Sequence, residues 1–292
     1  VKLLWDCCHK TYISYNAIKK QLKQRSSRCN YEDRKNEFLS YQKTKKKTKR
    51  AEKKLIKKLL KFLVRLLNVH NQIVTQKGIT LSLKQNVQML TITKVYGQQH
   101  SKVYGAVEQI KDRIVSLSKP YIRPIVRGKE TKAVEFGAKV NKLQVDGISF
   151  IEHFSYDAFN EGARLKNCIE MHQQLFGKCT HHSADKIYAT NKNRKYCTSK
   201  KIVTNFAPKG KQKAAHIQQS KTMRAILNKE RGTRLEGSFG NEKNHYQLQK
   251  INARNAITEK CWIFFGMMTA NASIITNRRQ KALQEQQQKQ AA

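Results

Sequence analysis

The scarcity of helix-breaking residues in the first part of the chain is the feature that most limits its fold. Residues 1–112 contain no proline, and only Gly78 and Gly97 precede Gly105. A helix interior tolerates glycine and proline least of all residues, so their scarcity predicts long helices. Segment 1–23 agrees, because its apolar residues recur at the spacing of one helix face. We therefore expect 1–112 to form an all-helical region.

A strongly basic segment within this region carries a second pattern. Segment 43–61 has eleven Lys and Arg residues against Glu52 alone. Apolar residues from Leu55 to Leu67 are spaced by three and four, which predicts an amphipathic helix with a buried stripe and a basic outer face. This excess of cations is too large for i,i+4 pairing to neutralise, so a solvated face and a phosphate-contacting face both stay open. The candidate phosphate contacts are Lys46, Lys47, Lys49, Arg50, Lys53 and Lys54.

The charge of the whole chain indicates the kind of partner. Fifty-nine Lys and Arg residues stand against twenty Asp and Glu residues in 292, a formal net charge of +39. A field of this size favours a polyanion, and nucleic acid is the first candidate, with binding that weakens as salt rises. A membrane surface is the second candidate, and a structural protein associated with the ribosome is a third.

The cysteine pattern and the hydropathy indicate the cellular compartment in which we expect the chain. Seven cysteines are scattered without a Cys-x-x-Cys pair, so neither a zinc ribbon nor a disulfide framework is indicated. Cys179-Thr-His181-His182 lacks a second ligand pair for a zinc site. No run of eighteen apolar residues is present, so we expect no membrane span. A reducing cytoplasm fits this pattern, and DNA binding would place the protein at the nucleoid.

The composition changes at Ile114, where β-branched residues and two of the three prolines appear. Alternation over 133–145, the turn pair Asp146-Gly147 and segment 148–154 predict a β-hairpin. The remaining patterns predict helices over 157–176, 191–198, 222–246 (broken near Gly237 and Gly240) and 256–275 (largely buried), and strands over 180–184 and 201–206. This order predicts an α/β layer with a mixed sheet over 113–278. The glutamine-rich tail, 279–292, is expected to be flexible.

Two acids in this second region could share a metal ion. Asp185 follows a predicted strand, where α/β folds place their chemistry, and Glu236 lies on a predicted helix. Two such carboxylates can hold hard divalent cations, which in pairs support phosphoryl transfer. Arg231, Arg234 and Lys243 would then hold phosphate. Taken by itself, Glu236 is better explained as one acid on a basic surface helix than as a metal ligand.

Other acids compete for this role. Asp146 is most simply a turn residue, and Asp157 and Glu161 suit the first turn of a helix. Local pattern therefore gives each of them a structural reason to be acidic.

Six blocks occur in an order that resembles one family. They are Arg113-Ile-Val-Ser-Leu, Arg123-Pro-Ile-Val-Arg-Gly-Lys129, Val134-Glu-Phe-Gly-Ala-Lys139, Ala184-Asp-Lys-Ile-Tyr188, Asn193-Arg-Lys-Tyr-Cys197 and Arg234-Leu-Glu-Gly-Ser-Phe-Gly240. Together they resemble bacterial insertion-sequence transposases of the DDE class, which have an RNase H-like catalytic domain. The resemblance covers nearly the whole chain.

The resemblance implies a role for several residues. Asp185 matches the second catalytic acid, Glu236 the third, and Lys243 the basic position on the same helix. Arg127 and Lys129 lie in a matching block and are further candidate DNA contacts. Two Mg²⁺ or Mn²⁺ ions, double-stranded DNA at the element's ends and at the target, and a multimer such as a homodimer are also implied. Residues 1–112 match the helical region that follows the first core strand.

The chain departs from the family at its first acid. In the family that aspartate lies on the first strand, upstream of the segment that Val1-Lys-Leu-Leu-Trp5 resembles, and Asp6 has a helical context instead. We interpret the chain as N-terminally truncated or as a decayed copy, and expect it not to transpose. The alternatives are a basic nucleic-acid-binding protein without chemistry and an RNase H-like nuclease that cuts without joining.

Overall fold

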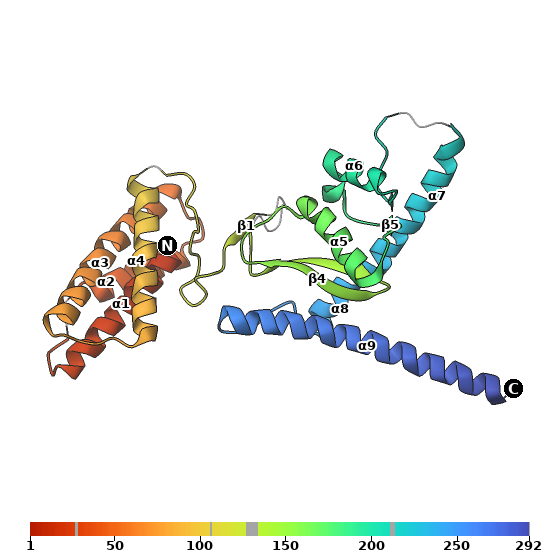
Figure 1. The fold of residues 1–292 in the computed structure, drawn as a ribbon. Coiled ribbons are helices and arrows are strands. Elements are labelled where there is room, and N and C mark those ends of the chain that lie inside the picture. Colours follow the sequence, from red (N-terminus) through yellow and green to blue (C-terminus); the bar gives the residue numbers. More distant parts are fainter. Residues whose placement is uncertain (27–28, 106, 127–133, 211–213, 292) are drawn as a thin grey trace. The chain divides into compact units, whose positions relative to one another are not determined.

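The computed structural model describes the chain except residues 27–28, 106, 127–133, 211–213 and 292 (Figure 1). The chain forms two compact units, Val1–Phe136 and Gly137–Ala292. The first is helical with one short hairpin, and the second mixes strands and helices, so the expected mixed α/β class with N-terminal helices is confirmed.

Four helices build most of the first unit, in agreement with the scarcity of glycine and proline. Thr48 caps the third helix by accepting a hydrogen bond from Ala51 N, and Ser82 and Gln85 form a capping box at the fourth. A short antiparallel hairpin follows, in which Pro124 pairs with Phe136. The elements are α1 (Lys2–Gln21), α2 (Tyr31–Lys43), α3 (Lys49–Gln76), α4 (Leu83–Tyr104), β1 (Pro124–Val126) and β2 (Val134–Phe136).

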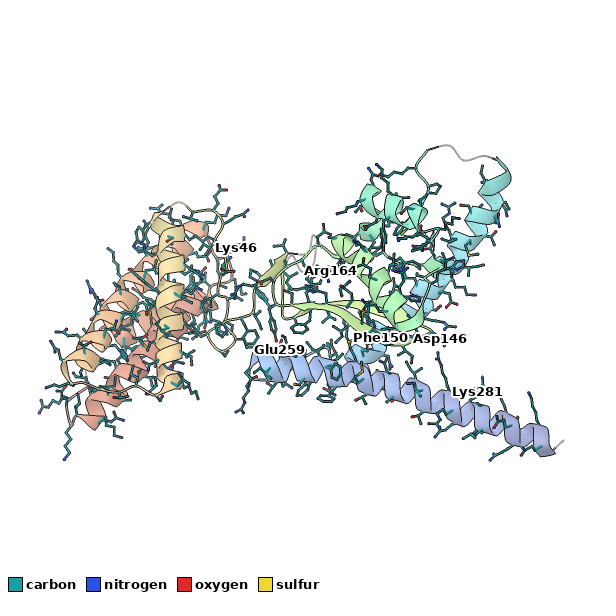
Figure 2. All side chains as sticks on the ribbon, in the orientation of Figure 1. Lys46, Asp146, Phe150, Arg164, Glu259 and Lys281 are labelled. Atoms are coloured by element: carbon teal, nitrogen blue, oxygen red, sulfur yellow. The ribbon has the colours of Figure 1, made fainter. Side chains whose placement is uncertain are left out.

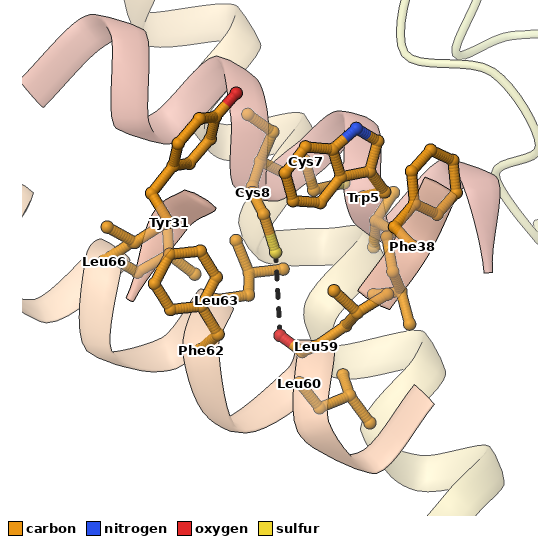
Figure 3. Packing of buried hydrophobic residues seen from close by; sticks show 14 of the residues in the cluster. Trp5, Cys7, Cys8, Tyr31, Phe38, Leu59, Leu60, Phe62, Leu63 and Leu66 are labelled. Carbon is orange, nitrogen blue, oxygen red and sulfur yellow. Dashed lines mark hydrogen bonds between the residues drawn. The ribbon is translucent and has the colours of Figure 1, made fainter. Parts of the chain in front are cut away.

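The core of the first unit lies between α1, α2, α3 and α4, and Figure 3 shows a part of it. Leu59 and Leu63 of α3 are fully buried, as the leucine spacing predicted. Trp5 stacks on Phe38 at 5.2 Å between ring centroids, and the Cys8 thiol donates to Leu59 O at 3.6 Å. The apolar stripe of the basic helix is therefore a genuine core element.

The second unit begins with the predicted hairpin. Strands β3 (Lys139–Val145) and β4 (Ile148–Ser155) pair antiparallel. Asp146 and Gly147 at the turn have φ values of +47° and +79°, which a two-residue hairpin turn of this kind requires. The strand expected over 133–145 is divided, because β2 ends at Phe136 and Gly137 has φ of +134°. A positive φ of this kind suits glycine and interrupts the strand.

A parallel pair and several helices follow the hairpin. Strands β5 and β6 pair in parallel and are connected through α6, with Leu165, Ile169 and Phe206 in the core beneath them. The elements are η1 (Glu161–Arg164), α5 (Leu165–Phe176), β5 (His181–His182), η2 (Lys186–Tyr188), α6 (Asn191–Ser199), β6 (Val203–Thr204), α7 (Ala214–Glu230), η3 (Arg231–Glu236), α8 (Gly237–His245) and α9 (Ala256–Ala291).

The strands do not join into the single mixed sheet that we expected. Within the described ranges they form three separate two-stranded sheets, β1–β2, β3–β4 and β5–β6. Each strand of a two-stranded sheet keeps one edge without a ladder partner. The class of the fold is therefore α/β. Among the described residues, no strand joins the β3–β4 hairpin to the parallel pair β5–β6.

The last two helical regions differ from the pattern-based expectation. Residues Arg231–Glu236 form a π-helix, and α8 continues through Gly237 and Gly240 instead of breaking there. Helix α9 buries a single stripe that includes Ile263 and Met267, while Phe265 on another face is 62% exposed, so the largely buried helix predicted there is wrong.

The tail expected to be flexible is helical as far as Ala291. Segment 280–291 contains Gln, Lys, Glu, Ala and Leu, which favour a helix, and it holds neither glycine nor proline. None of the helices in the described ranges combines the length and apolar character needed to cross a bilayer.

Candidate metal and nucleic-acid site

The strand end that carries Asp185 is held by a side-chain amide. Strand β5 is only two residues long, and Ala184, two residues beyond it, is hydrogen-bonded to the side chain of Asn205. Ala184 N donates to Asn205 Oδ1 at 3.0 Å, and Asn205 Nδ2 donates to Ala184 O at 2.9 Å. These two bonds replace the next ladder pair beyond β6. The position of Asp185 therefore depends on Asn205, which the sequence analysis did not single out.

The same strand end is tied to the C-terminal part of α7. Ser183 Oγ donates to Leu227 O at 2.8 Å, and Asn205 Nδ2 donates to Asn228 Oδ1 at 2.8 Å. These bonds therefore join the strand segment that precedes Asp185 to the end of α7, which directly precedes the π-helix. This contact joins the strand end to α7 and not to the π-helical segment that carries Glu236.

Asp185 is exposed and starts η2. Its Oδ1 accepts from Lys186 N at 2.6 Å. The turn is fixed from behind, since Tyr188 Oη donates to Asn141 Oδ1 at 2.5 Å and Asn193 Nδ2 donates to Tyr188 O at 2.8 Å. Burial raises the pKa of Tyr188 well above its usual value, so this phenol acts as a structural donor.

Asp185 lines a cavity of about 610 Å³ with a strongly basic wall. Its lining contains one carboxylate, five cationic side chains, two asparagines and several small apolar residues around Phe206. Five cations against one acid make the cavity attractive to anions. The cationic residues are Lys186, Arg194, Lys221, Arg224 and Arg231.

Arg194 differs from the other cations of this wall. Its Nη1 donates to Ala207 O at 2.6 Å, and its Nε donates to Ala189 O at 3.0 Å. The guanidinium also lies 5.5 Å from the ring centroid of Phe206. Arg194 therefore braces the loops around the cavity while adding positive charge to it.

Glu236 reaches the border of this cavity through Arg231. The side chain of Glu236 is 57% exposed, and its Oε1 lies 2.7 Å from Arg231 Nη1. Arg231 itself lines the cavity together with Asp185, whereas Glu236 is not among the lining residues and adjoins the cavity only through its ion pair with Arg231. The intervening Arg231–Glu236 segment is π-helical, a rare conformation that is found often at functional sites.

The other predicted phosphate contacts of this unit have different settings. Arg234 is engaged by two acids, with Nη1 at 2.7 Å from Asp146 Oδ1 and Nε at 2.7 Å from Glu230 Oε2. Asp146, labelled in Figure 2, also binds Arg278 at 3.0 Å. Arg234 thus fastens the π-helix to the hairpin turn. Lys243 is exposed on α8.

The remaining predicted contacts lie in the first unit. Arg127 and Lys129 fall outside the described residues. Each member of the predicted basic face is exposed, and Lys47 additionally donates to Thr44 O at 3.0 Å. These exposed cations are Lys46, Lys47, Lys49, Arg50, Lys53 and Lys54.

Asp146 and Glu161 have the structural roles that their patterns indicated, whereas Asp157 lies in a bend before η1 and not in the first turn of a helix. Asp146 occupies the hairpin turn, and Glu161 opens η1 and pairs with Lys139 at 2.9 Å. Across the described ranges no three His, Cys, Asp or Glu side chains gather as a metal-binding group. Asp185 and Glu236 supply the oxygen donors that Mg²⁺ and Mn²⁺ prefer, but Glu236 must leave Arg231 to act as a ligand.

A buried ion pair that the sequence analysis missed holds α8 to the hairpin. Lys142 Nζ lies 2.9 Å from Glu242 Oε1, with side chains only 1% and 6% exposed. Ser149 Oγ donates to the same carboxylate oxygen at 3.2 Å, and Asn271 of α9 exchanges two hydrogen bonds with the Ser149 backbone. Burial lowers the pKa of Lys142, and the hydrogen bond to Glu242 opposes this. The pair orients α8, which directly follows Glu236 in the chain.

The site thus has a donor set, a basic cavity and a fixed strand-to-helix contact. No family model, no curated protein and no solved structure matches this chain.

Proposed function

We propose that the second unit is the core of a DNA-acting phosphoryltransferase of the transposase class, with Asp185 and Glu236 as its metal ligands. The observation that carries this proposal is the cavity in which Asp185 stands among five cationic side chains, one of which, Arg231, holds Glu236. Phosphodiesters need cations for their oxygens and acids for the metal, and this wall offers both.

The residues of the cavity have separable tasks in this proposal. Lys221 and Arg224 of α7 hold phosphate oxygens of the backbone. Arg231 exchanges Glu236 for a phosphate, which frees the glutamate when DNA arrives and keeps the local charge balanced. A divalent ion held by Asp185 and Glu236 would polarise the phosphorus centre and acidify an attacking water or hydroxyl. Asn205 keeps Asp185 at the strand end.

The order of elements supports an RNase H-like class for this core. An antiparallel hairpin precedes a parallel pair joined through a helix, with the acid beyond the carboxyl end of a strand. Because losing one member of a catalytic unit usually removes most activity, we expect two acids alone to support DNA binding but no transposition.

A metal-binding experiment tests the proposal without requiring turnover. Mn²⁺ bound to the full chain in the presence of duplex DNA is measured by electron paramagnetic resonance. We expect Asp185→Ala and Glu236→Ala each to weaken Mn²⁺ binding at least tenfold, while Glu170→Ala, at a half-exposed helical glutamate, leaves it unchanged. Equal Mn²⁺ affinity in all four proteins would refute the assignment.

A second candidate is a basic DNA-binding protein without chemistry. The Arg231–Glu236 ion pair favours it, because there Glu236 serves as a counterion. In that case Asp185→Ala and Glu236→Ala leave the DNA affinity unchanged. Mn²⁺ binding is then weak and equal in both variants and in the unchanged chain. A nuclease that cuts without joining would share both ligands and differ only in its products.

A further inference from the structure

A second basic cavity lies in the first unit, whereas the residues proposed for chemistry belong to the second unit. It has a volume of about 710 Å³ and is bordered by α1, α2, α3 and the loop that precedes α2. Its cationic side chains are Lys19, Arg34, Lys58, Lys61 and Arg65. The predicted basic face at 46–54 contributes none of them, so this is a different surface of the helical unit.

The charges of this cavity are only partly compensated. Glu37 binds Arg34 and Lys58, both at 2.6 Å. Lys61 and Arg65 have no acid within ion-pair distance in the part of the chain that the structure describes, and both are exposed. The cavity therefore keeps a surplus of positive charge that an anion can satisfy.

Three of these cations, of which only Lys58 is paired with an acid among the described residues, form a row along one helix. Lys58, Lys61 and Arg65 are three and four positions apart on α3, which places them on the same face. The helical rise separates them by about 4.5 and 6 Å along the axis, so the row is about 10 Å long. A row of this length matches several phosphates of a chain better than one compact anion.

The remaining wall of the cavity is mostly apolar. Tyr15 of α1 and Val69 of α3 are its accessible apolar side chains, and Phe62 and Leu66 are only 8% and 3% exposed. Cys29 and Asn30 complete the lining. The ammonium of Lys19 lies 5.4 Å from the Tyr15 ring centroid. A cationic row beside an aromatic and aliphatic wall is the combination that binds single-stranded nucleic acid, with phosphates on the cations and bases against the wall.

We propose that this cavity binds a single strand of nucleic acid through its phosphodiester backbone. The inference shares with the proposed function only the expectation of a nucleic-acid partner. It places an additional contact in the first unit, independent of Asp185 and Glu236. A single strand fits better than a duplex, because the apolar wall can contact bases only when they are unpaired.

The test uses the full chain and a fluorescein-labelled oligothymidylate, followed by fluorescence anisotropy at several salt concentrations. The variant is Lys61→Ala/Arg65→Ala. The control is Lys281→Ala/Lys289→Ala, which removes the same charge from the exposed end of α9 (Figure 2). Because all four side chains are exposed, both variants should fold, and circular dichroism checks this.

We expect the cavity variant to lose at least tenfold in affinity and to lower the salt slope by about 1.4, at 0.7 per single-strand phosphate contact. The control should stay within about twofold. Equal loss in both variants would overturn the inference, as would an unchanged salt slope. Tripolyphosphate binding that depends on Lys61 and Arg65, with oligonucleotide affinity that does not, would assign the cavity to a compact polyphosphate instead.

The outcomes separate this inference from the proposed function. Loss of strand binding with normal Mn²⁺ binding supports the cavity and leaves the metal site intact. Normal strand binding in the cavity variant, with Mn²⁺ binding that depends on Asp185 and Glu236, rejects only the cavity.

Discussion

Removing the carboxylate of Glu242 should destabilise the second unit more than any surface charge change. The side chain of Lys142 is 1% exposed, and without Glu242 its ammonium keeps Ser238 Oγ, at 2.6 Å, as its remaining side-chain hydrogen-bond partner. A buried charge stripped of its counterion costs about 3–5 kcal/mol. We expect Glu242→Gln to lower the free energy of unfolding of this unit by that amount.

The two tryptophans of the chain allow the two units to be followed separately. Trp5 lies in the first unit and Trp262 in the second, so Trp5→Phe makes Trp262 the sole indole reporter. Urea unfolding of Glu242→Gln in this background measures the loss. Glu170→Gln, which breaks a half-exposed i,i+4 pair with Lys166, should cost no more than about 0.5 kcal/mol.

The double variant Lys142→Met/Glu242→Leu gives the decisive comparison. Because neither charge remains to be desolvated, the pair should cost far less than the single substitution and can even stabilise. A loss below about 1 kcal/mol for Glu242→Gln would show that water reaches Lys142 and would refute the buried-pair argument. Equal losses of stability in the single and the double variant would also refute the buried-pair argument.

The pH dependence of the single variant has a definite sign. The pKa of Lys142 is lowered in the fold by burial, so between its folded and unfolded pKa values the unfolded chain binds the extra proton. The free energy of unfolding therefore rises with pH in that alkaline window. In Glu242→Gln the hydrogen bond from Lys142 to the Glu242 carboxylate, which raises the pKa of Lys142, is lost. The rise in the free energy of unfolding should therefore begin at lower pH.

Two further predictions concern a buried histidine and the core of the first unit. Burial, with a smaller effect of His172, lowers the pKa of His182 from 6.5 to about 4, so the second unit should lose up to roughly 3 kcal/mol as pH falls from 6.5 to 4. His182→Gln should flatten this part of the pH profile read by Trp262, and an unchanged profile would contradict the burial argument. Leu63→Ala, at a fully buried position, should cost about 2–5 kcal/mol when followed by Trp5 in a Trp262→Phe background. A loss under 1 kcal/mol would mean that the core collapses around the cavity.

Local patterns predicted the features that depend on near neighbours in the sequence. The spacing from Leu55 to Leu67 placed the stripe of α3 correctly, because an amphipathic helix is defined within a few turns. The pair Asp146-Gly147 located the hairpin turn, since its two positive φ values are a local requirement.

Features that depend on distant partners were beyond those patterns. Strand pairing is one, and the expected mixed sheet became three small sheets because hydrogen-bonded edges are set by tertiary neighbours. Arg234 is another, since its partner Asp146 is 88 positions away. The partnership of Lys142 with Glu242 spans 100 positions, so no window of sequence could reveal it.

The candidate site combines both kinds of information. Asp185 was singled out because an acid after a strand is a local signal, whereas its fixation by Asn205 and the approach of α7 required the fold. The ion pair between Arg231 and Glu236 then gives the site its particular character. One guanidinium satisfies the glutamate and also faces the anion-binding cavity, so a phosphate entering the cavity competes with Glu236 for it. Within the proposed function, the arrival of DNA is therefore what makes Glu236 available to a metal ion, and metal and DNA should bind cooperatively.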